Sequence, residues 1–550
     1  MRVAALCVAS SAVACTGGSD PVAQQLEQLQ QQVTAKAYDA QIQSPVADNA
    51  SGAATTMIAA SVFVPAHAPG ATYPLIIHSH GWGGDRITPQ DAADNAPNDE
   101  PTDFYSVVLD RQIKHLWDAG YAVISFDERG FHDSAGASRV MDPAYETRDA
   151  IAILDWAEAN LDLARDDSGD PLIGSLGGSY GGGFQLLLAA LDPRVDALVP
   201  GATWNDLVDA LVPNGVVKKL YAFGLCFSAV QAGRTLDTPT QKACTQSGYD
   251  PLIRFAEGVS PDVLEFLHGH GLRAMQERHD NPADPFRMRR VDALFVQGNR
   301  DVLFPINQAL ANVRFLSGLG GDIRLMTNEH GHFIPPPLSS QPGPGWWGCG
   351  PYDSTQVLQD WFDAKLRGQT DKLAQIPRVC LSLDDAHAVT LPELPIADDS
   401  HVVNIEPTTV TGAQNDFAGL PATFVALAGA GDLSGYVLAG VPVANLNVES
   451  TIPGTEGTAF VGIGIRHADG SVSLVDDQIN PLRSSDTHQF RELIAVGERL
   501  QSGDVPGILL YGAFHQYEPA VPVNFLTNAY TISGTVALPL AQLDVLERTP

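Results

Sequence analysis

The pattern of apolar and polar positions divides this chain into two parts that differ in secondary structure. In residues 55–390, short apolar runs of strand length alternate with longer runs of helical periodicity, which is typical of an α/β domain with a parallel sheet. A proline-rich, acidic stretch begins at Leu391, and beyond it the apolar positions alternate in short runs such as residues 423–428 and 459–466. The pattern predicts a doubly wound α/β domain followed by an all-β sandwich at residues 391–550.

A long insertion interrupts the α/β pattern after the strand that ends near Pro200. About ninety residues separate it from the next strand, far more than one crossover helix needs. Helical periodicity in residues 204–211, 216–223 and 261–267 predicts an inserted helical cap over residues 205–290. We expect the cap to cover the site and to shape an apolar pocket, although core packing explains its aromatic residues equally well. The candidate wall residues are Trp82, Trp204, Tyr221 and Phe223.

One glycine-rich turn carries the first candidate for chemistry. A strand-like run at residues 172–176 leads into Gly-Gly-Ser-Tyr-Gly at residues 177–181 and then into a helical run. Glycines on both sides allow a turn so tight that the serine stands at its apex with an exposed hydroxyl. This strand-turn-helix context is typical of a nucleophile elbow and makes Ser179 the candidate nucleophile. The alternative is a glycine-rich loop with an ordinary serine.

A serine nucleophile needs a base to take its proton and an acid to orient that base. The apolar run from Ala293 leads to Asp301, just beyond the carboxyl end of the predicted strand, and the following strand leads to His330 and His332. We predict Asp301 as the acid, with a helix-capping aspartate as the alternative, and His332 as the base, with His330 as the second candidate. The order Ser, Asp, His is that of the α/β-hydrolases. Because the histidine pair lacks a third ligand at a recognisable spacing, we expect no metal.

The oxyanion hole is predicted from the loop after the apolar run at residues 73–79. This loop reads His-Gly-Trp-Gly-Gly at residues 80–84, in the usual position of the first oxyanion donor. We expect the backbone N–H of Trp82 and that of Tyr180, the residue after the nucleophile, to be the two donors. His80 is expected to brace the loop rather than to carry a proton.

Further motifs occur in order between these segments. They are the loop pattern D-x-R-G-x-x-x-S-x-G at residues 127–136, the helical pattern E-x-x-D at residues 146–149, Trp156, and the extended elbow G-x-S-Y-x-G. Together they resemble the family of X-prolyl dipeptidyl aminopeptidases and bacterial cocaine esterase (CocE/NonD-like). The resemblance covers residues 55–370, and the β-rich part that follows extends it. It implies an α/β-hydrolase fold with a C-terminal jelly-roll domain.

The loop after residue 79 departs from that resemblance. Members of the family often have a Pro-Tyr pair there, with the tyrosine hydroxyl donating to the oxyanion, whereas this chain has Trp82 in a glycine-rich loop. Main-chain donors, as in general esterases, suit this loop better. We therefore predict a serine hydrolase that cleaves carboxylic esters through a Ser-His-Asp triad and an acyl-enzyme. A dipeptidyl peptidase of the X-Pro type is the alternative, and a non-catalytic binding protein on the same scaffold is the third possibility.

The net charge of the chain excludes two classes of binding partner. A net charge of −32 over 550 residues repels nucleic acid and anionic membranes, so we expect neither as a partner. The predicted chemistry needs a small ester or a short peptide as substrate and no cofactor. The sequence leaves the substrate's identity, the oligomeric state and the role of the sandwich open.

The first residues are typical of an export signal. Arg2 precedes an apolar stretch that is too short to span a bilayer, and small residues precede Cys15. The Ala-Val-Ala-Cys motif resembles a bacterial lipoprotein cleavage box. We predict a signal peptide at residues 1–15, lipid on Cys15, and a tether and N-terminal segment at residues 16–54. Ordinary signal-peptidase cleavage after Ala14 is the alternative. We expect the protein on the cell envelope or secreted.

Four cysteines remain once the signal is set aside. They are Cys226, Cys244, Cys349 and Cys380, an even number in a protein expected in an oxidising compartment. Proximity along the chain favours Cys226–Cys244 and Cys349–Cys380. Buried free thiols are the alternative.

Overall fold

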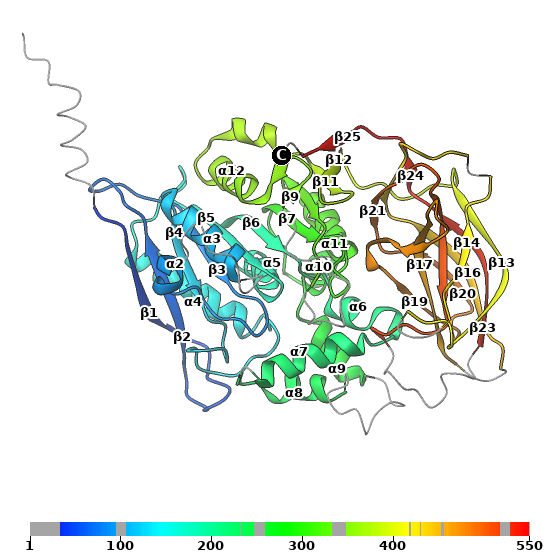
Figure 1. The fold of residues 1–550 in the computed structure, drawn as a ribbon. Helices are drawn as coiled ribbons and strands as arrows, with labels where there is room; N and C mark the ends of the chain where they lie inside the picture. Colours follow the sequence, from blue (N-terminus) through cyan, green and yellow to red (C-terminus); the bar gives the residue numbers. More distant parts are fainter. Residues whose placement is uncertain are drawn as a thin grey trace, which may run out of the picture.

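The computed structural model describes residues 33–94, 106–231, 233–246, 259–332, 348–416, 420–429, 431–452, 456–517 and 529–548. Figure 1 shows an α/β part around a central sheet and, beside it, a part built of strands coloured yellow to red. The predicted signal peptide and the lipid site at Cys15 lie outside the described residues. Within the described ranges, no helix is long and apolar enough to cross a membrane.

An 11-stranded sheet forms the centre of the α/β part, in the order β1-β2-β4-β3-β5-β6-β7-β8-β11-β12-β25. Neighbouring strands from β4 to β11 in this order are parallel, and the pairs nearer the two edges are antiparallel. The chain runs outward from β3 to β4 and then crosses back to β5, so the strand order reverses there. Doubly wound sheets bind ligands at this switch point. The strands are β1 (Lys36–Ser44), β2 (Thr56–Val64), β3 (Leu75–Ser79), β4 (Ala122–Phe126), β5 (Ile173–Gly178), β6 (Val195–Gly201), β7 (Asp292–Gly298), β8 (Ile323–Asn328), β11 (Val379–Ser382), β12 (His387–Leu391) and β25 (Val545–Glu547).

Helices cover both faces of this sheet. All five residues of β3 and all five of β4 are buried, as expected for parallel strands covered on both sides. Side chains of α3 and α12, including the fully buried Trp361, pack on one face, and those of α4, α5 and α11 pack on the other. The helices are α2 (Pro89–Asp94), α3 (Ser106–Asp118), α4 (Glu146–Asn160), α5 (Tyr180–Leu191), α11 (Ile306–Gly318) and α12 (Ser354–Leu366).

The segment between β6 and β7 forms the inserted helical cap that the sequence predicts (Figure 1). One predicted helix, residues 261–267, matches α9. A second, residues 204–211, begins only at Leu207, because Asp206 caps it by accepting the Val208 N–H. The third predicted helix overlaps the start of the longer α7. The cap helices are α6 (Leu207–Leu211), α7 (Lys219–Gln231), α8 (Thr238–Cys244), α9 (Pro261–His268) and α10 (Leu272–Asp280).

The C-terminal part consists of antiparallel sheets, as predicted. A sheet in the order β13-β23-β16-β20 and a sheet in the order β14-β22-β17-β18, with β19 on β17, share one apolar core, and β21-β15-β24 adds a third sheet. β17 and β18 form a hairpin, with Arg466 of β17 opposite Val472 of β18. The strands are β13 (Val402–Thr411), β14 (Thr423–Ala426), β15 (Val437–Gly440), β16 (Val443–Ser450), β17 (Thr458–Arg466), β18 (Val472–Leu474), β19 (Asn480–Arg483), β20 (His488–Glu492), β21 (Val496–Arg499), β22 (Val505–Tyr511), β23 (Ala529–Ala537) and β24 (Leu540–Ala541).

Two strands join the central sheet from outside residues 55–390. β1 lies in the predicted N-terminal segment and pairs with β2 from Lys36 to Ser44. β25, near the end of the chain, pairs with β12 rather than with the sandwich. Both strands have few or no buried positions, so the hydrophobic pattern does not reveal that they extend the sheet.

Two disulfides confirm the predicted cysteine pairing. Cys226–Cys244 joins α7 to α8 within the cap, and Cys349–Cys380 joins β9 (Gly348–Cys349) to β11. The paired cysteines are 18 and 31 residues apart in the chain. Each disulfide therefore restricts the unfolded chain and stabilises the fold.

The start of α5 lies directly against the end of β3, and only glycine permits this contact. A Cβ at Gly181 would lie 2.1 Å from the carbonyl oxygen of Ser79, and a Cβ at Gly177 would lie 2.6 Å from the same oxygen. Real Cβ atoms do not approach an oxygen this closely. The two glycines therefore bring the turn at Ser179 against the loop that follows β3.

We predict that Gly181→Ala destabilises the protein, because the backbone must move to admit the methyl group. The expected cost is about 1–3 kcal/mol or more, as for other overpacked sites. Gly224 in α7 is the control, since a Cβ there would meet nothing within 4 Å. Gly224→Ala should be neutral or stabilise by about 0.5–1 kcal/mol. Thermal melting of both purified variants compares them, and equal melting temperatures would contradict the tight contact at Gly181.

Candidate active site

Ser179 occupies the sharp turn between β5 and α5. Its φ of 56° and ψ of −116° place it in a region that a residue with a Cβ rarely adopts, which costs about 1–3 kcal/mol. Two hydrogen bonds hold the turn: the Ser179 N–H donates to the Gly201 carbonyl over 2.9 Å, and the Thr203 hydroxyl donates to the Ser179 carbonyl over 2.9 Å. This geometry is that of a nucleophile elbow, with the side chain at the apex of the turn.

His332 lies between Ser179 and Asp301 and contacts both. Its Nε2 is 2.9 Å from Ser179 Oγ, and its Nδ1 is 2.6 Å from Asp301 Oδ2. A proton on Nδ1 can be donated to the carboxylate, which leaves Nε2 as the acceptor for the serine hydroxyl. His332 is 8% exposed and Asp301 1% exposed. Side chains predicted from three separate segments thus form one hydrogen-bonded chain.

The second candidate base, His330, lies on the same loop and is also buried. Its backbone N–H donates to Asn328 Oδ1 over 3.1 Å. The imidazole that contacts the hydroxyl of Ser179 is that of His332.

Backbone and side-chain donors fix the carboxylate of Asp301. Oδ1 accepts the N–H of Leu303 over 3.0 Å and that of Phe304 over 2.8 Å, and Gln297 Nε2 donates to Oδ2 over 3.1 Å. Asp301 does not cap the next helix, because the N-cap of α11 is Pro305. The carboxylate is therefore held in the orientation in which it meets His332.

Two buried side chains that sequence reasoning missed hold the turn that carries Asp301. Lys218, directly before α7, donates through Nζ to the carbonyls of Val302 and Leu303 over 2.6 and 3.1 Å. Burial lowers the pKa of Lys218 to about 7, and the negative charge of Asp301 opposes this shift. Gln478, from the C-terminal part, donates through Nε2 to the Asp301 carbonyl over 3.1 Å. No motif marks either residue, since each lies far from Asp301 along the chain.

The loop after β3 lies beside the elbow. A Cβ at Gly81 would be 3.8 Å from the Cβ of Ser179, which places the backbone of this loop next to the serine. The Trp82 ring packs edge-on against Tyr180, with ring centroids 5.2 Å apart. Tyr180 is the first residue of α5, where the helix supplies no acceptor for the backbone N–H. The structure thus brings both predicted oxyanion-hole residues to the side of Ser179.

His80 holds this loop in place. Its Nδ1 contacts the Gly81 carbonyl at 2.8 Å, and its Nε2 accepts the backbone N–H of Glu128 over 3.1 Å. These partners require a proton on Nδ1 and none on Nε2, and burial lowers the pKa of the ring. A neutral imidazole with both nitrogens engaged agrees with the bracing role expected from the sequence.

The motif residues at 127–149 form buried ion pairs behind the site. Arg129 makes a two-pronged contact with Asp149, at 2.7 and 2.9 Å, and both side chains are fully buried. Asp127 pairs with Arg86 of the loop after β3. Ser134 donates to the Asp127 carbonyl over 2.7 Å. These contacts join the loop after β4 to α4 and to the oxyanion loop, so the motif residues hold the scaffold rather than line the pocket.

A largely apolar pocket opens beside Ser179, and we call it the cap pocket. Together with the open space at its mouth it measures about 800 Å³, and it is lined by the elbow, by Trp82, Val140 and Phe304, and by side chains of the cap from residues 204–244 and 259–267. Trp82 and Trp204 were predicted as wall residues and line it. The other two predicted wall residues do not line the pocket: Tyr221 is buried in another part of the protein, and Phe223 is exposed.

Among the described residues, no group of three or more His, Cys, Asp and Glu side chains is placed to hold a metal ion.

Solved structures share this architecture. The chain is similar to a CocE/NonD family hydrolase from Staphylococcus aureus, with a TM-score of 0.57, 12% identity, and coverage of 92% of this chain and 97% of that one. It is similar to an α-amino acid ester hydrolase, with a TM-score of 0.59 and 12% identity over 92% and 97% of the two chains. An aminopeptidase from a marine-sediment Thaumarchaeota archaeon gives a TM-score of 0.54 and 13% identity over 91% and 96%. At this identity the likeness concerns the fold.

Sequence comparisons identify the family. An uncharacterised 31.7 kDa protein of the traX-finO intergenic region of Escherichia coli is 33% identical over 136 residues, which are 24% of this chain and only 38% of that protein. The model of the X-Pro dipeptidyl-peptidase (S15 family) matches residues 52–333, just over half of the chain. The match includes the elbow, Asp301 and His332, and the resemblance seen in the sequence is confirmed. The chain therefore belongs to the X-Pro dipeptidyl-peptidase (S15) family.

Proposed function

We propose that the protein is an exported serine hydrolase that cleaves carboxylic esters, with Ser179 as nucleophile, His332 as base and Asp301 as the residue that orients the base. The observation that carries this proposal is the hydrogen-bonded chain of these three side chains at the switch point of the sheet. The three residues come from separate segments that the fold brings together. Their order along the chain, Ser, Asp, His, is that of the α/β-hydrolases.

The first half of the reaction forms an acyl-enzyme. His332 Nε2 takes the proton of Ser179 as Oγ attacks the ester carbonyl, and the resulting imidazolium stays paired with Asp301. The oxygen of the tetrahedral intermediate carries a negative charge, which the N–H groups of Trp82 and Tyr180 stabilise. The intermediate collapses as His332 gives its proton to the departing alcohol, and the acyl group remains on Ser179.

The second half of the reaction releases the acid. Water attacks the acyl carbonyl while His332 takes one of its protons, and the same two N–H groups stabilise the second oxyanion. His332 then returns the proton to Ser179 Oγ as the acyl bond breaks. Enzyme and base return to their starting states, and every proton taken is given back.

Peptide hydrolysis is the second candidate, and membership of the S15 family favours it. An amide needs its leaving nitrogen protonated, and a dipeptidyl peptidase must also hold the substrate's free amine in register, which requires anionic groups. The described residues that line the cap pocket include no Asp or Glu. This supports ester hydrolysis as the main activity.

Export to an oxidising compartment is part of the proposal. The two disulfides support it, since structural disulfides are rare in the cytosol. We propose that Cys15 carries lipid, and cleavage after Ala14 without lipid is the alternative. Mass spectrometry of the mature N-terminus distinguishes the two.

We predict that Ser179→Ala removes ester hydrolysis and labelling by a fluorophosphonate. The rate should fall by about 10⁴-fold or more while the fold survives, because no other group replaces the nucleophile. The control is Ser175→Ala, which changes a buried serine on β5, the strand before the elbow, and should still be labelled. Labelling of a folded Ser179→Ala variant would reject Ser179 as the nucleophile.

Substitution of His332 and of His330 should reduce ester hydrolysis to very different extents. His332→Ala should lose about as much activity as Ser179→Ala, because triad members act as a unit, whereas His330→Ala should lose far less. Steady-state kcat values of the two variants with p-nitrophenyl butyrate measure the difference. A larger loss in His330→Ala would assign the base to His330.

Ester turnover should exceed amide turnover. We expect kcat/KM for short p-nitrophenyl esters to be higher than for X-Pro p-nitroanilides, because the described residues that line the cap pocket include no carboxylate to pair with a substrate amine. Parallel assays of one wild-type preparation, with Ser179→Ala as the blank, make the comparison. An X-Pro amide cleaved faster than every ester would make the protein a peptidase.

A further inference from the structure

We infer that the cap pocket takes an uncharged hydrocarbon acyl group longer than acetyl, so that the substrates are esters of apolar carboxylic acids. This inference rests on the proposed function, since the pocket matters only if Ser179 holds the acyl group. Among the described residues that line the pocket there is no Asp, Glu, Lys, Arg or His.

The tryptophans of the wall turn their polar atoms away from a ligand. The indole N–H of Trp82 donates to the Leu225 carbonyl over 2.9 Å, and that of Trp204 donates to the His270 carbonyl over 2.8 Å. An indole nitrogen has one hydrogen to donate and no acceptor. Both rings therefore present only carbon to the pocket.

The hydroxyls of the wall are engaged as well. Thr240 donates to the Ser138 carbonyl over 3.0 Å, and the Tyr180 hydroxyl accepts the N–H of Met141 over 2.9 Å and contacts Ser138 Oγ at 3.2 Å. A polar substituent on the acyl group would lose its water on entry and find little to replace it. Burial of a charge without a partner is more costly still.

Two carboxylates next to the pocket wall, those of Asp142 and Asp237, share a cationic partner. Arg139 pairs with Asp142 on its own loop and with Asp237, the N-cap of α8. Asp237 also accepts the backbone N–H of Thr240 over 3.0 Å. An amine on the substrate would have to displace Arg139 to reach either carboxylate.

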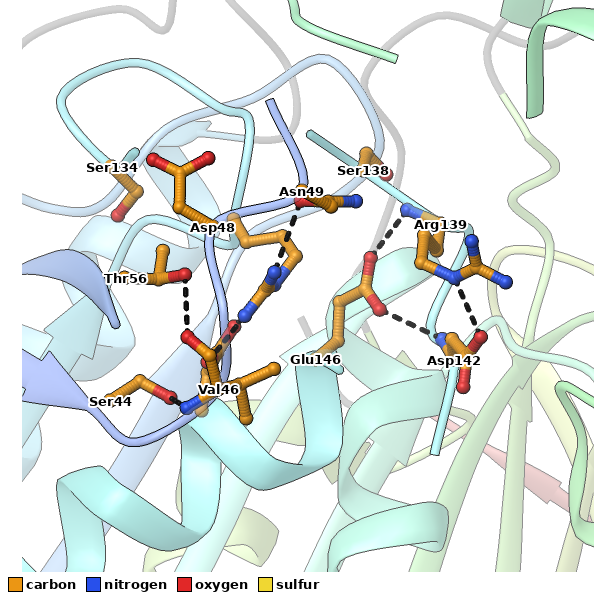
Figure 2. Close-up of polar contacts among 12 residues, drawn as sticks. Ser44, Val46, Asp48, Asn49, Thr56, Ser134, Ser138, Arg139, Asp142 and Glu146 are labelled. Carbon is orange, nitrogen blue, oxygen red and sulfur yellow. Dashed lines mark hydrogen bonds and ion pairs between the residues drawn. The ribbon is translucent and has the colours of Figure 1, made fainter. Parts of the chain in front are cut away.

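A strained turn shapes one wall of the pocket, and Figure 2 shows the contacts of Arg139, Asp142 and Glu146 that hold it. Val140 has a φ of 58° and Met141 a φ of 66°, and for a β-branched residue such as valine this is a rare conformation. The buried carboxylate of Glu146 holds the turn on both sides, as it accepts the N–H of Arg139 over 2.6 Å and that of Asp142 over 3.0 Å. Strain of this kind persists only where neighbours enforce it and is concentrated at functional sites. Here it holds Val140 in the wall.

The test measures kcat/KM of the wild-type enzyme with p-nitrophenyl esters from acetate to decanoate, each corrected by Ser179→Ala. We expect kcat/KM to rise by about fourfold per methylene until the pocket is full, the factor that corresponds to about 0.8 kcal/mol for each buried CH₂. Two charged comparators have similar size: p-nitrophenyl 2-aminohexanoate and the mono-p-nitrophenyl ester of adipic acid. After division by the alkaline hydrolysis rate, each should react at least about 100-fold less well than the hexanoate, because its charge has no partner.

Variants of the wall test the same inference. Ala243 of α8 lines the pocket, so Ala243→Leu should move the best substrate to a shorter chain. Gln241→Leu is the matched control, since Gln241 lies on the same helix and is exposed. Val140→Gly relieves the positive φ and removes the side chain, so it should move the best substrate to a longer or branched chain.

The outcomes separate the inference from the proposed function. A flat profile from acetate to decanoate, or faster turnover of the amino ester than of the hexanoate, would overturn the inference while Ser179-dependent ester hydrolysis stands. A complete lack of Ser179-dependent ester hydrolysis would overturn the proposed function and the inference with it. A kcat/KM that rises with acyl chain length, with the best substrate shorter in Ala243→Leu but unchanged in Gln241→Leu, supports the proposed function and the inference.

Discussion

The hydrogen bond between Asp301 and His332 joins two loops that lie 31 residues apart, and three parts of the molecule hold the acid in place. From the sheet, Gln297 donates to the carboxylate. From the cap, Lys218 donates to the carbonyls that follow Asp301. From the C-terminal part, Gln478 donates to the Asp301 carbonyl. A small displacement of an orienting group is costly in catalysis, so the position of Asp301 depends on the docking of all three parts.

The C-terminal sandwich is therefore a neighbour of the active site. Arg300, next to the acid, pairs with Asp477 of the sandwich at 3.1 Å and lies 3.7 Å from Glu329, just before the base loop. The sandwich turn itself is strained, with a φ of 54° at Asp476 and 56° at Asp477. Burial raises the pKa of Asp476 and that of Glu329, while the Arg300 charge opposes both shifts. One cation thus ties the acid loop, the base loop and the sandwich together.

The sequence predicts best what is local in the chain. Ser179, Asp301 and His332 each follow an apolar strand directly, so a pattern of a few residues marks each of them, and the strand ends of a parallel sheet meet at one edge. Lys218 and Gln478, which hold the turn at Asp301, have no such local pattern. Lys218 lies 84 residues from its partner Val302, and Gln478 lies 177 residues from Asp301. The sequence pattern also does not predict that β1 and β25 belong to the central sheet, because these edge strands bury few side chains.

Tyr180 connects the two strained turns of the site. Its backbone N–H begins α5 directly after Ser179, where an oxyanion would be bound, and its hydroxyl accepts the N–H of Met141 in the turn that carries Val140. The ring is buried and packs against Trp82 of the oxyanion loop. A buried side chain that is held at both ends deforms little, so one rigid residue sets the distance between Ser179 and the turn at Val140. In the proposed reaction this couples the selection of the acyl chain to the geometry of the oxyanion hole, because neither turn can move without displacing the tyrosine.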